Sequence, residues 1–138
     1  MADTASLIAG AAEWLRGSPA QRLAAARLLA RFGSRSGDAD PLPLGMLLAL
    51  ASDPHPNVRG KAAAALTHSL AWTSSTACQE AVRIAASDAG CRTPLAVARA
   101  LPEACTDTDM RQQLAAILLQ HPSALVRNAV SSAPSGVS

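Results

Sequence analysis

The chain has 138 residues, of which 49% are hydrophobic but only 2% are aromatic. Its formal net charge of +2, from 12 basic and 10 acidic residues, excludes a strong overall attraction to nucleic acid or to a membrane surface. The apolar residues are mostly Ala and Leu, which favour helices, and β-branched and aromatic residues are too few for a sizeable sheet. We therefore expect one all-α domain covering residues 1–138.

The cysteines and the apolar runs indicate in which cellular compartment the protein is expected. Cys78, Cys91 and Cys105 are odd in number and far apart, which favours a reducing, intracellular setting over a disulfide framework. The N-terminus lacks the basic region of a signal peptide, and the longest apolar run, residues 42–51, is too short to cross a bilayer. We expect a cytoplasmic protein with no membrane segment.

Apolar residues spaced by three or four, interrupted by Gly, Pro and Ser, predict four pairs of helices. The predicted pairs cover about residues 4–33, 44–72, 75–102 and 107–132. Residues 34–43 are polar and rich in Gly, Asp and Pro, and are expected to form a loop. In the third pair, the residues expected to face the core are Ala77, Ala81, Ile84 and Ala85, and the second helix is expected to begin at Leu95.

Two turns of the chain resemble each other. In DPHPNVRGKA (53–62) and QHPSALVRNAV (120–130), a Pro-containing turn leads into Val-Arg early in the following helix. Arginines recur near this point at Arg22, Arg59, Arg92 and Arg127, at intervals of 37, 33 and 35 residues. A period near 35 with two helices per unit is typical of an α-solenoid.

These residues resemble the HEAT-repeat family, whose unit has Asp-Pro in the turn and Val-Arg at the start of its second helix. The matching positions are Asp53, Pro54, Val58 and Arg59, followed by Ala62, Ala65 and Leu66. The match is best in residues 44–71 and extends to 107–132, whereas Arg22 and Arg92 are assigned by position only. The resemblance implies an all-α, right-handed α-solenoid of about four antiparallel helix pairs.

Other architectures were compared with this one. Thr93-Pro94-Leu95 is similar to the ankyrin signature, but Ala96 replaces its His and no other unit carries the motif. The tetratricopeptide pattern requires Tyr, which this chain lacks. A helical bundle without repeats stays open as the alternative.

Catalytic and metal-binding motifs are missing from the sequence. We interpret His55 as a solvated turn residue and Asp53 as the helix cap. The cysteines, together with His68 or His121, lack the closely spaced ligand pair that structural zinc sites use. We predict no catalytic residue, no cofactor and no metal.

The resemblance also implies a structural role for two arginines. In HEAT arrays this arginine pairs with a turn Asp of a neighbouring unit, so Arg59 and Arg127 are expected to form such a ladder, with Asp53 as the matching acid. A separate basic segment holds Arg16, Arg22, Arg27, Arg31 and Arg35 and no acidic residue. It is either a ridge able to meet phosphates or an acidic protein, or a solvated face balanced by Asp38 or Asp40.

The leading hypothesis is a non-enzymatic scaffold that binds a protein or peptide. Second helices line the concave face of HEAT arrays, and their outward residues are the candidate binding residues: Arg27, Arg31, Lys61, Ala64, His68 and Asn128. The alternatives are nucleic-acid backbone binding through the Arg-rich face, and a HEAT-like enzyme subunit such as the lyases that attach bilin pigments. The end of the array near Leu118 and Leu119 is expected to be incompletely covered, and self-association or docking through it is predicted.

Overall fold

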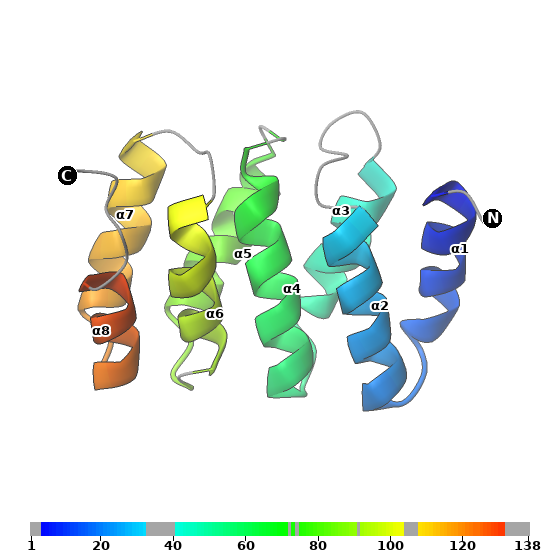
Figure 1. The fold of residues 1–138 in the computed structure, drawn as a ribbon, viewed down its shortest axis with the longest axis horizontal. Coiled ribbons are helices and arrows are strands. Elements are labelled where there is room, and N and C mark those ends of the chain that lie inside the picture. Colours follow the sequence, from blue (N-terminus) through cyan, green and yellow to red (C-terminus); the bar gives the residue numbers. More distant parts are fainter. Residues whose placement is uncertain are drawn as a thin grey trace.

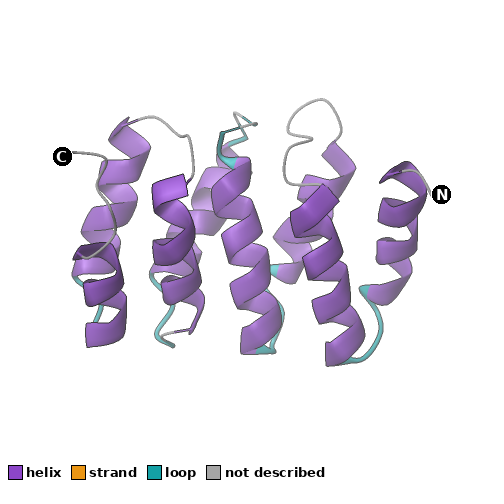
Figure 2. Ribbon diagram, viewed as in Figure 1, coloured by secondary structure: helices purple, strands orange, loops and turns teal. Residues whose placement is uncertain are grey.

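The structure, a computed structural model, describes residues 4–32, 41–71, 73, 75–90, 92–103 and 108–131. Within these ranges it is all-helical, with no strand, which confirms the all-α part of the predicted fold class (Figure 2). The elements are α1 (Thr4–Trp14), α2 (Pro19–Phe32), α3 (Pro41–Leu50), α4 (Pro56–Ser69), α5 (Thr76–Ala86), α6 (Arg92–Ala100), the 3-10 turn η2 (Leu101–Glu103), α7 (Thr108–Leu119) and α8 (Ala124–Ser131).

The helices form two rows. Helices α2, α4, α6 and α8 stand side by side in chain order in the nearer row, with α3, α5 and α7 behind them (Figure 1). Each odd-numbered helix packs against the even-numbered helix that follows it, and the turns within these pairs lie along the same, lower edge in Figure 1. Helices α1 and α8 therefore mark opposite ends of the row. None of the described helices is both long and apolar enough to span a membrane.

Local capping explains why the second helices begin where they do. Before α2, the Ser18 hydroxyl accepts from the Gln21 N–H at 3.2 Å, and the Gln21 side-chain oxygen accepts from the Ser18 N–H at 2.9 Å. This reciprocal capping box satisfies two donors that a helix start leaves unpaired. Before α4, His55 Nδ1 accepts from the Asn57 N–H at 3.2 Å. His55, and not Asp53, is therefore the cap of α4, which corrects the sequence-based assignment.

Helix α3 begins earlier than expected. The sequence predicted a loop over residues 34–43, but the structure has a helix from Pro41 onward. Proline fits the first turn of a helix, since its missing N–H would have no partner there and its φ is already helical. The rest of the predicted loop, up to residue 40, lies outside the described residues.

Helix α6 also begins earlier than expected, at Arg92 and not at Leu95. Its α-helical part ends at Ala100, and the chain continues as the 3-10 turn that contains Pro102. The sequence placed the end of this helix at the proline, because proline cannot donate the helical hydrogen bond.

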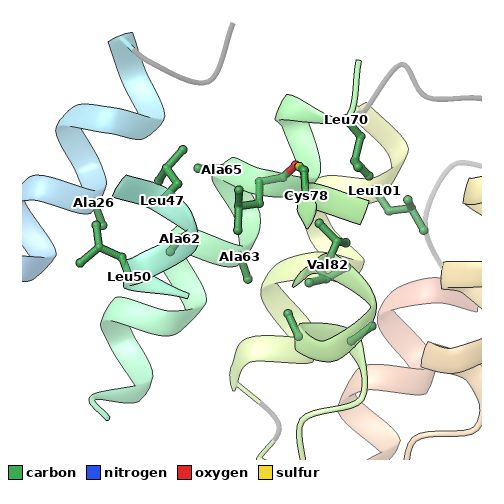
Figure 3. Close-up of a cluster of buried hydrophobic side chains, with 14 of the residues drawn as sticks. Ala26, Leu47, Leu50, Ala62, Ala63, Ala65, Leu70, Cys78, Val82 and Leu101 are labelled. Atoms are coloured by element: carbon green, nitrogen blue, oxygen red, sulfur yellow. The ribbon is translucent and has the colours of Figure 1, made fainter. Parts of the chain in front are cut away.

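Small residues form much of the core between the two rows. Ala26, Ala62 and Ala63 are fully buried beside larger groups such as Leu47 (Figure 3). Alanine occupies little volume, so neighbouring helix backbones can approach closely and still pack at high density. The core therefore depends on the close spacing of helices more than on large side chains.

Helix α5 buries only part of the face predicted for it, since Ala85 is buried and Ala81 packs against the core. Cys78 and Val82 are fully buried, whereas Ala77 is exposed and Ile84 is 63% exposed. Apolar residues lie on more than one side of this helix, so the spacing of apolar residues identified the buried face only in part. The prediction that Ala77 and Ile84 point inward is wrong.

Candidate functional site: a basic groove on a ladder of Arg–Asp pairs

Arginines on the second helices tie adjacent helix pairs together. Arg22 on α2 binds Asp53 in the turn before α4, with Nε at 2.5 Å from Oδ2 and Nη2 at 3.2 Å from Oδ1. Arg59 on α4 lies in the same way against Asp88, in the turn before α6, with Nε at 3.3 Å from Oδ2. The expected pairing of Arg59 with a turn Asp of a neighbouring unit is therefore present. Its partner differs from the one expected, because Asp53 pairs with Arg22 of the preceding unit.

The same arginines also bind the turn of their own unit. Arg22 Nη1 donates to the Gly17 carbonyl at 2.8 Å, and Arg59 Nη1 donates to the Asp53 and Pro54 carbonyls at 3.0 and 2.9 Å. Arg127 Nη1 repeats the contact with the carbonyls of the turn before α8, at 2.6 and 2.8 Å. Arg127 is thus held in the ladder position, but no acid of the described residues pairs with it.

One turn position recurs in three successive units. Asp53 Oδ1 accepts from the N–H two residues ahead at 2.8 Å, and Asp88 Oδ1 does the same at 2.9 Å. His121 Nδ1 repeats this contact at 3.0 Å, and its Nε2 donates to the Asp88 carbonyl at 2.8 Å. We call this position the turn acceptor. Because it recurs after 35 and then 33 residues, it fixes the register between units.

With that register, the ladder position of the third helix pair is not at Arg92. Counting 35 residues from Arg59 leads to Pro94. Burial agrees, since Val58 and Ala62 of α4 then correspond to Thr93 and Val97 of α6, all of them buried. Arg92 therefore does not occupy the ladder position assigned to it from the sequence.

Burial and hydrogen bonding act in opposite directions on Asp53, which is 7% exposed. Burial alone raises the pKa of a carboxyl group. The Arg22 guanidinium and the His55 N–H outweigh burial, and the pKa of Asp53 lies below its ordinary value. Asp53 is thus held as a carboxylate by its partners, as a structural ion pair requires.

A groove of about 800 Å³ opens across α2, α4 and α6, and we call it the α2–α4–α6 groove. Small side chains contribute to its lining, together with two leucines: Gly60, Ala64, Ala96, Ala100, Leu23 and Leu95. Its basic side chains are Arg27, Lys61, Arg92 and Arg99, and Asn57 and His68 complete the lining. None of these lining residues is acidic, so the groove concentrates positive charge.

Four of the six predicted binding residues line this groove: Arg27, Lys61, Ala64 and His68. Arg31 lies one helical turn beyond Arg27 on α2 and does not line it. Asn128 lies on α8, also outside the groove, and Arg35 of the predicted basic ridge is outside the described residues.

Sequence reasoning missed Arg92 and Arg99. They stand seven residues apart on α6, which places them two helical turns apart on one face. This spacing was visible in the sequence. It was overlooked because Arg92 had been assigned to the ladder.

Helices α4 and α6 approach closely at Gly60. A Cβ added there would lie 3.7 Å from Arg92 Cγ, 3.8 Å from the Arg92 carbonyl oxygen and 3.9 Å from Ala96 Cβ. These are ordinary van der Waals distances, so the space would accept a methyl group. Beside this point, Arg92 Nη1 donates to Asn57 Oδ1, which links the first turns of the two helices.

Cysteine chemistry is suppressed at the one cysteine that the structure describes. Cys78 is fully buried, its Sγ lies 3.5 Å from the Leu66 carbonyl oxygen, and burial raises the pKa of its thiol to about 11. The reactive thiolate is therefore disfavoured at neutral pH. Cys91 and Cys105 lie outside the described residues, and among the described side chains no group of three or more metal-type ligands gathers.

Comparisons of the chain with models of protein families, with curated proteins and with solved structures find no match. The groove and the ladder are therefore interpreted from their own geometry and chemistry.

Proposed function

We propose that this chain is a HEAT-like, right-handed α-solenoid of four helix pairs that serves as a non-enzymatic scaffold. It binds an acidic peptide segment of a protein partner in the α2–α4–α6 groove. The observation that carries this proposal is the lining of the groove, with four basic side chains, small residues and no acid.

The repeated contacts between units support the solenoid. Arg22–Asp53 and Arg59–Asp88 join successive units through the same atoms, and the second helices stand in one row in chain order. A solenoid is an array in which each unit packs on its neighbours, and it presents one continuous face to ligands. The α2–α4–α6 groove lies on the row of second helices.

The chemistry of the groove favours an acidic segment. Arg27, Arg92 and Arg99 carry planar guanidinium groups that can bind carboxylates through two parallel hydrogen bonds. Lys61 is exposed and adds a mobile positive charge. The small residues let a peptide backbone or helix lie close, and Leu23 and Leu95 offer contact to its apolar side chains.

A peptide library with graded acidic content tests the proposal. We expect the wild-type protein to enrich fluorescent peptides rich in Asp and Glu over neutral and basic ones of equal length. Lys61→Glu and Arg99→Glu each place a negative charge in the groove and should weaken this binding by about tenfold or more. Arg111→Glu, on α7 in the other row, has the same charge change and should leave binding unaltered.

Two outcomes would count against the proposal. One is a library without acidic enrichment, and the other is equal binding by Lys61→Glu and Arg111→Glu. Arg31→Glu, one turn from Arg27, shows how far the site extends along α2. A loss of binding in that variant would add Arg31 to the site.

Nucleic-acid backbone binding is the second candidate, because the same four basic side chains could contact phosphates. No Phe, Tyr or Trp lines the groove to stack on bases, and its two leucines suit a peptide better. A fluorescent DNA duplex titrated at two salt concentrations separates the candidates. Affinity that falls steeply with salt would support nucleic acid, and absence of binding at low salt would remove it.

A further inference from the structure

The register between helix pairs brings three groove residues to equivalent positions on neighbouring helices. The interval of 37 residues between the first two units leads from Arg27 on α2 to Ala64 on α4, and the next interval of 35 residues leads to Arg99 on α6. All three residues line the α2–α4–α6 groove, and α4 stands between α2 and α6 in the row (Figure 1). One arginine therefore stands on each side of a single alanine.

Two further polar side chains lie one helical turn to either side of this alanine, on α4 itself. Lys61 comes three residues before Ala64 and His68 four residues after it, so all three share one face of the helix. Both polar residues line the groove. Ala64 is thus surrounded by four side chains that carry hydrogen-bond donors, three of them positively charged at neutral pH. We call these five residues the Ala64 site.

The cations of the Ala64 site are available to a ligand. Within the part of the chain that the structure describes, no hydrogen bond or ion pair engages the side chain of Arg27, Lys61 or Arg99, and all three residues are exposed. Arg92, in the same groove, differs from them because its guanidinium already donates to Asn57 Oδ1. The uncompensated charge of the groove is therefore concentrated around its alanine floor.

The number of charges distinguishes between two kinds of acidic ligand. A carboxylate brings one negative charge and two acceptor oxygens. A phosphorylated Ser or Thr brings a charge of about −1.5 to −2 at pH 7 and three strongly accepting oxygens. Three cations and the His68 ring match the second ligand, because each phosphoryl oxygen can meet a donor of its own. No acidic residue lines the groove to oppose the additional negative charge.

We propose that the acidic segment bound in the α2–α4–α6 groove is a phosphopeptide, whose phosphorylated Ser or Thr lies over Ala64 between Arg27 and Arg99. This inference rests on the proposed function and deepens it, since it assigns the residue of the bound peptide that the basic side chains recognise. Clusters of arginine are a recurring means of binding phosphorylated residues. Phosphorylation of the partner therefore controls its binding to this scaffold.

Three fluorescein-labelled peptides test the assignment. They share one acidic background of Glu, Ala and Leu and differ only in the central residue, which is phosphoserine, Glu or Ser. Fluorescence anisotropy with the wild-type protein should show binding of the phosphoserine peptide at least about tenfold tighter than that of the Glu peptide. The Ser peptide should bind most weakly. The ratio of the first two affinities measures the preference for the phosphoryl group.

Substitutions separate the Ala64 site from the general charge of the groove. Arg27→Gln and Arg99→Gln each remove a guanidinium beside the alanine and should lower the preference for phosphoserine over Glu by about fivefold or more. Arg92→Gln is the matched control. It removes the same charge from the same groove, but two helical turns from Arg99 and at a side chain that Asn57 already engages, so the preference should stay unchanged.

A steric variant tests the floor of the site. Ala64→Leu keeps every cation but fills the space over α4 with a larger side chain, and leucine is also a good helix former. It should abolish the preference for phosphoserine, because the phosphoryl group can no longer lie between the two arginines. Circular dichroism establishes that each variant is folded.

The outcomes distinguish this inference from the proposed function. Acidic enrichment in the peptide library together with equal binding of the phosphoserine and Glu peptides would overturn the phosphopeptide assignment and leave the proposed function standing. Absence of binding by every acidic and phosphorylated peptide would overturn both. A preference that Arg92→Gln lowers as much as Arg99→Gln does, or that Ala64→Leu leaves intact, would overturn the placement of the phosphoryl group over Ala64.

Discussion

The first and third junctions between helix pairs have different residues at the two ladder positions and therefore use different polar contacts. At the first junction, Arg22 and Asp53 form an ion pair whose side chains are 19% and 5% exposed. At the third, Pro94 occupies the arginine position and His121 the acid position, and His121 donates to the Asp88 carbonyl. Both partners differ together, so neither junction leaves a buried charge alone.

This difference shows why the third junction can lack an Arg–Asp pair without loss of stability in the core. Removing one member of a buried pair leaves the other uncompensated, whereas replacing both can be nearly neutral. The neutral His121 contact also spans the junction, from the last turn to Asp88, which itself binds Arg59. Polar contacts therefore continue through the third junction, but without paired charges.

Removing the acid of the first junction should have the largest effect. Asp53→Ala leaves Arg22 without its carboxylate and the His55 N–H without its acceptor, and should lower the free energy of unfolding by about 3 kcal/mol. Asp88→Ala should cost only about 1 kcal/mol, because the Arg59 and Asp88 side chains are 24% and 26% exposed. Chemical denaturation measures both values. Equal losses would contradict the ranking of the two junctions.

Breaking the neutral contact of the third junction should cost less than Asp53→Ala. His121→Ala removes the donor to the Asp88 carbonyl and the acceptor of the Ser123 N–H, and should lower the free energy of unfolding by about 2 kcal/mol. The loss should be local, with faster hydrogen exchange in α8 and little change in α4. Uniformly faster exchange in all helices would show that the third junction is not a separate unit of stability.

A substitution beside the third junction should stabilise the protein. Thr93 is 3% exposed and its hydroxyl has no hydrogen-bond partner among the described residues, whereas the corresponding Val58 and Val126 are fully buried. Thr93→Val should raise the free energy of unfolding by about 1 kcal/mol. Thr67→Val is the matched control, since the Thr67 hydroxyl donates to the Ala63 carbonyl at 2.8 Å and should give no gain. Equal gains in the two variants would refute the argument from the unpaired hydroxyl.

Acid should weaken the first junction selectively, with the smallest effect of the four. The pKa of Asp53 is lowered in the folded protein, so its ion pair stabilises the fold above the unfolded value of about 4. This contribution is lost as pH falls through that value and below it. The effect is small because burial opposes the lowering. Denaturation between pH 6 and pH 3 measures it, and Asp53→Asn should show a shallower loss; identical pH profiles would contradict the assignment.

The sequence predicted the helices well, since apolar spacing and caps are local signals. Errors arose where a local signal had two meanings. A proline can end one helix or open the next, which is why the starts of α3 and α6 were placed late. Apolar residues on several sides of α5 likewise concealed that Cys78 and Val82, and not Ala77 and Ile84, are buried.

The site was only partly predictable, because register between units is not a local property. Lys61, Ala64 and His68 were found from their place on α4. The intervals between units are 37, 35 and 33 residues, so a fixed period could not locate Pro94 in the ladder. Arg92 was assigned to that position in its place, which removed it from the candidates for the groove.

Gly60 lowers the stability of α4 at the point where this helix borders the α2–α4–α6 groove. A glycine inside a helix costs about 1 kcal/mol relative to alanine, because its backbone loses more freedom on folding. The neighbouring Arg92 and Ala96 would accept the extra methyl group at ordinary contact distances, so packing does not demand glycine. Helix α4 is thus less stable than it would be with alanine at this position. Natural proteins retain such less stable residues wherever the stability of the fold stays above the threshold that function requires.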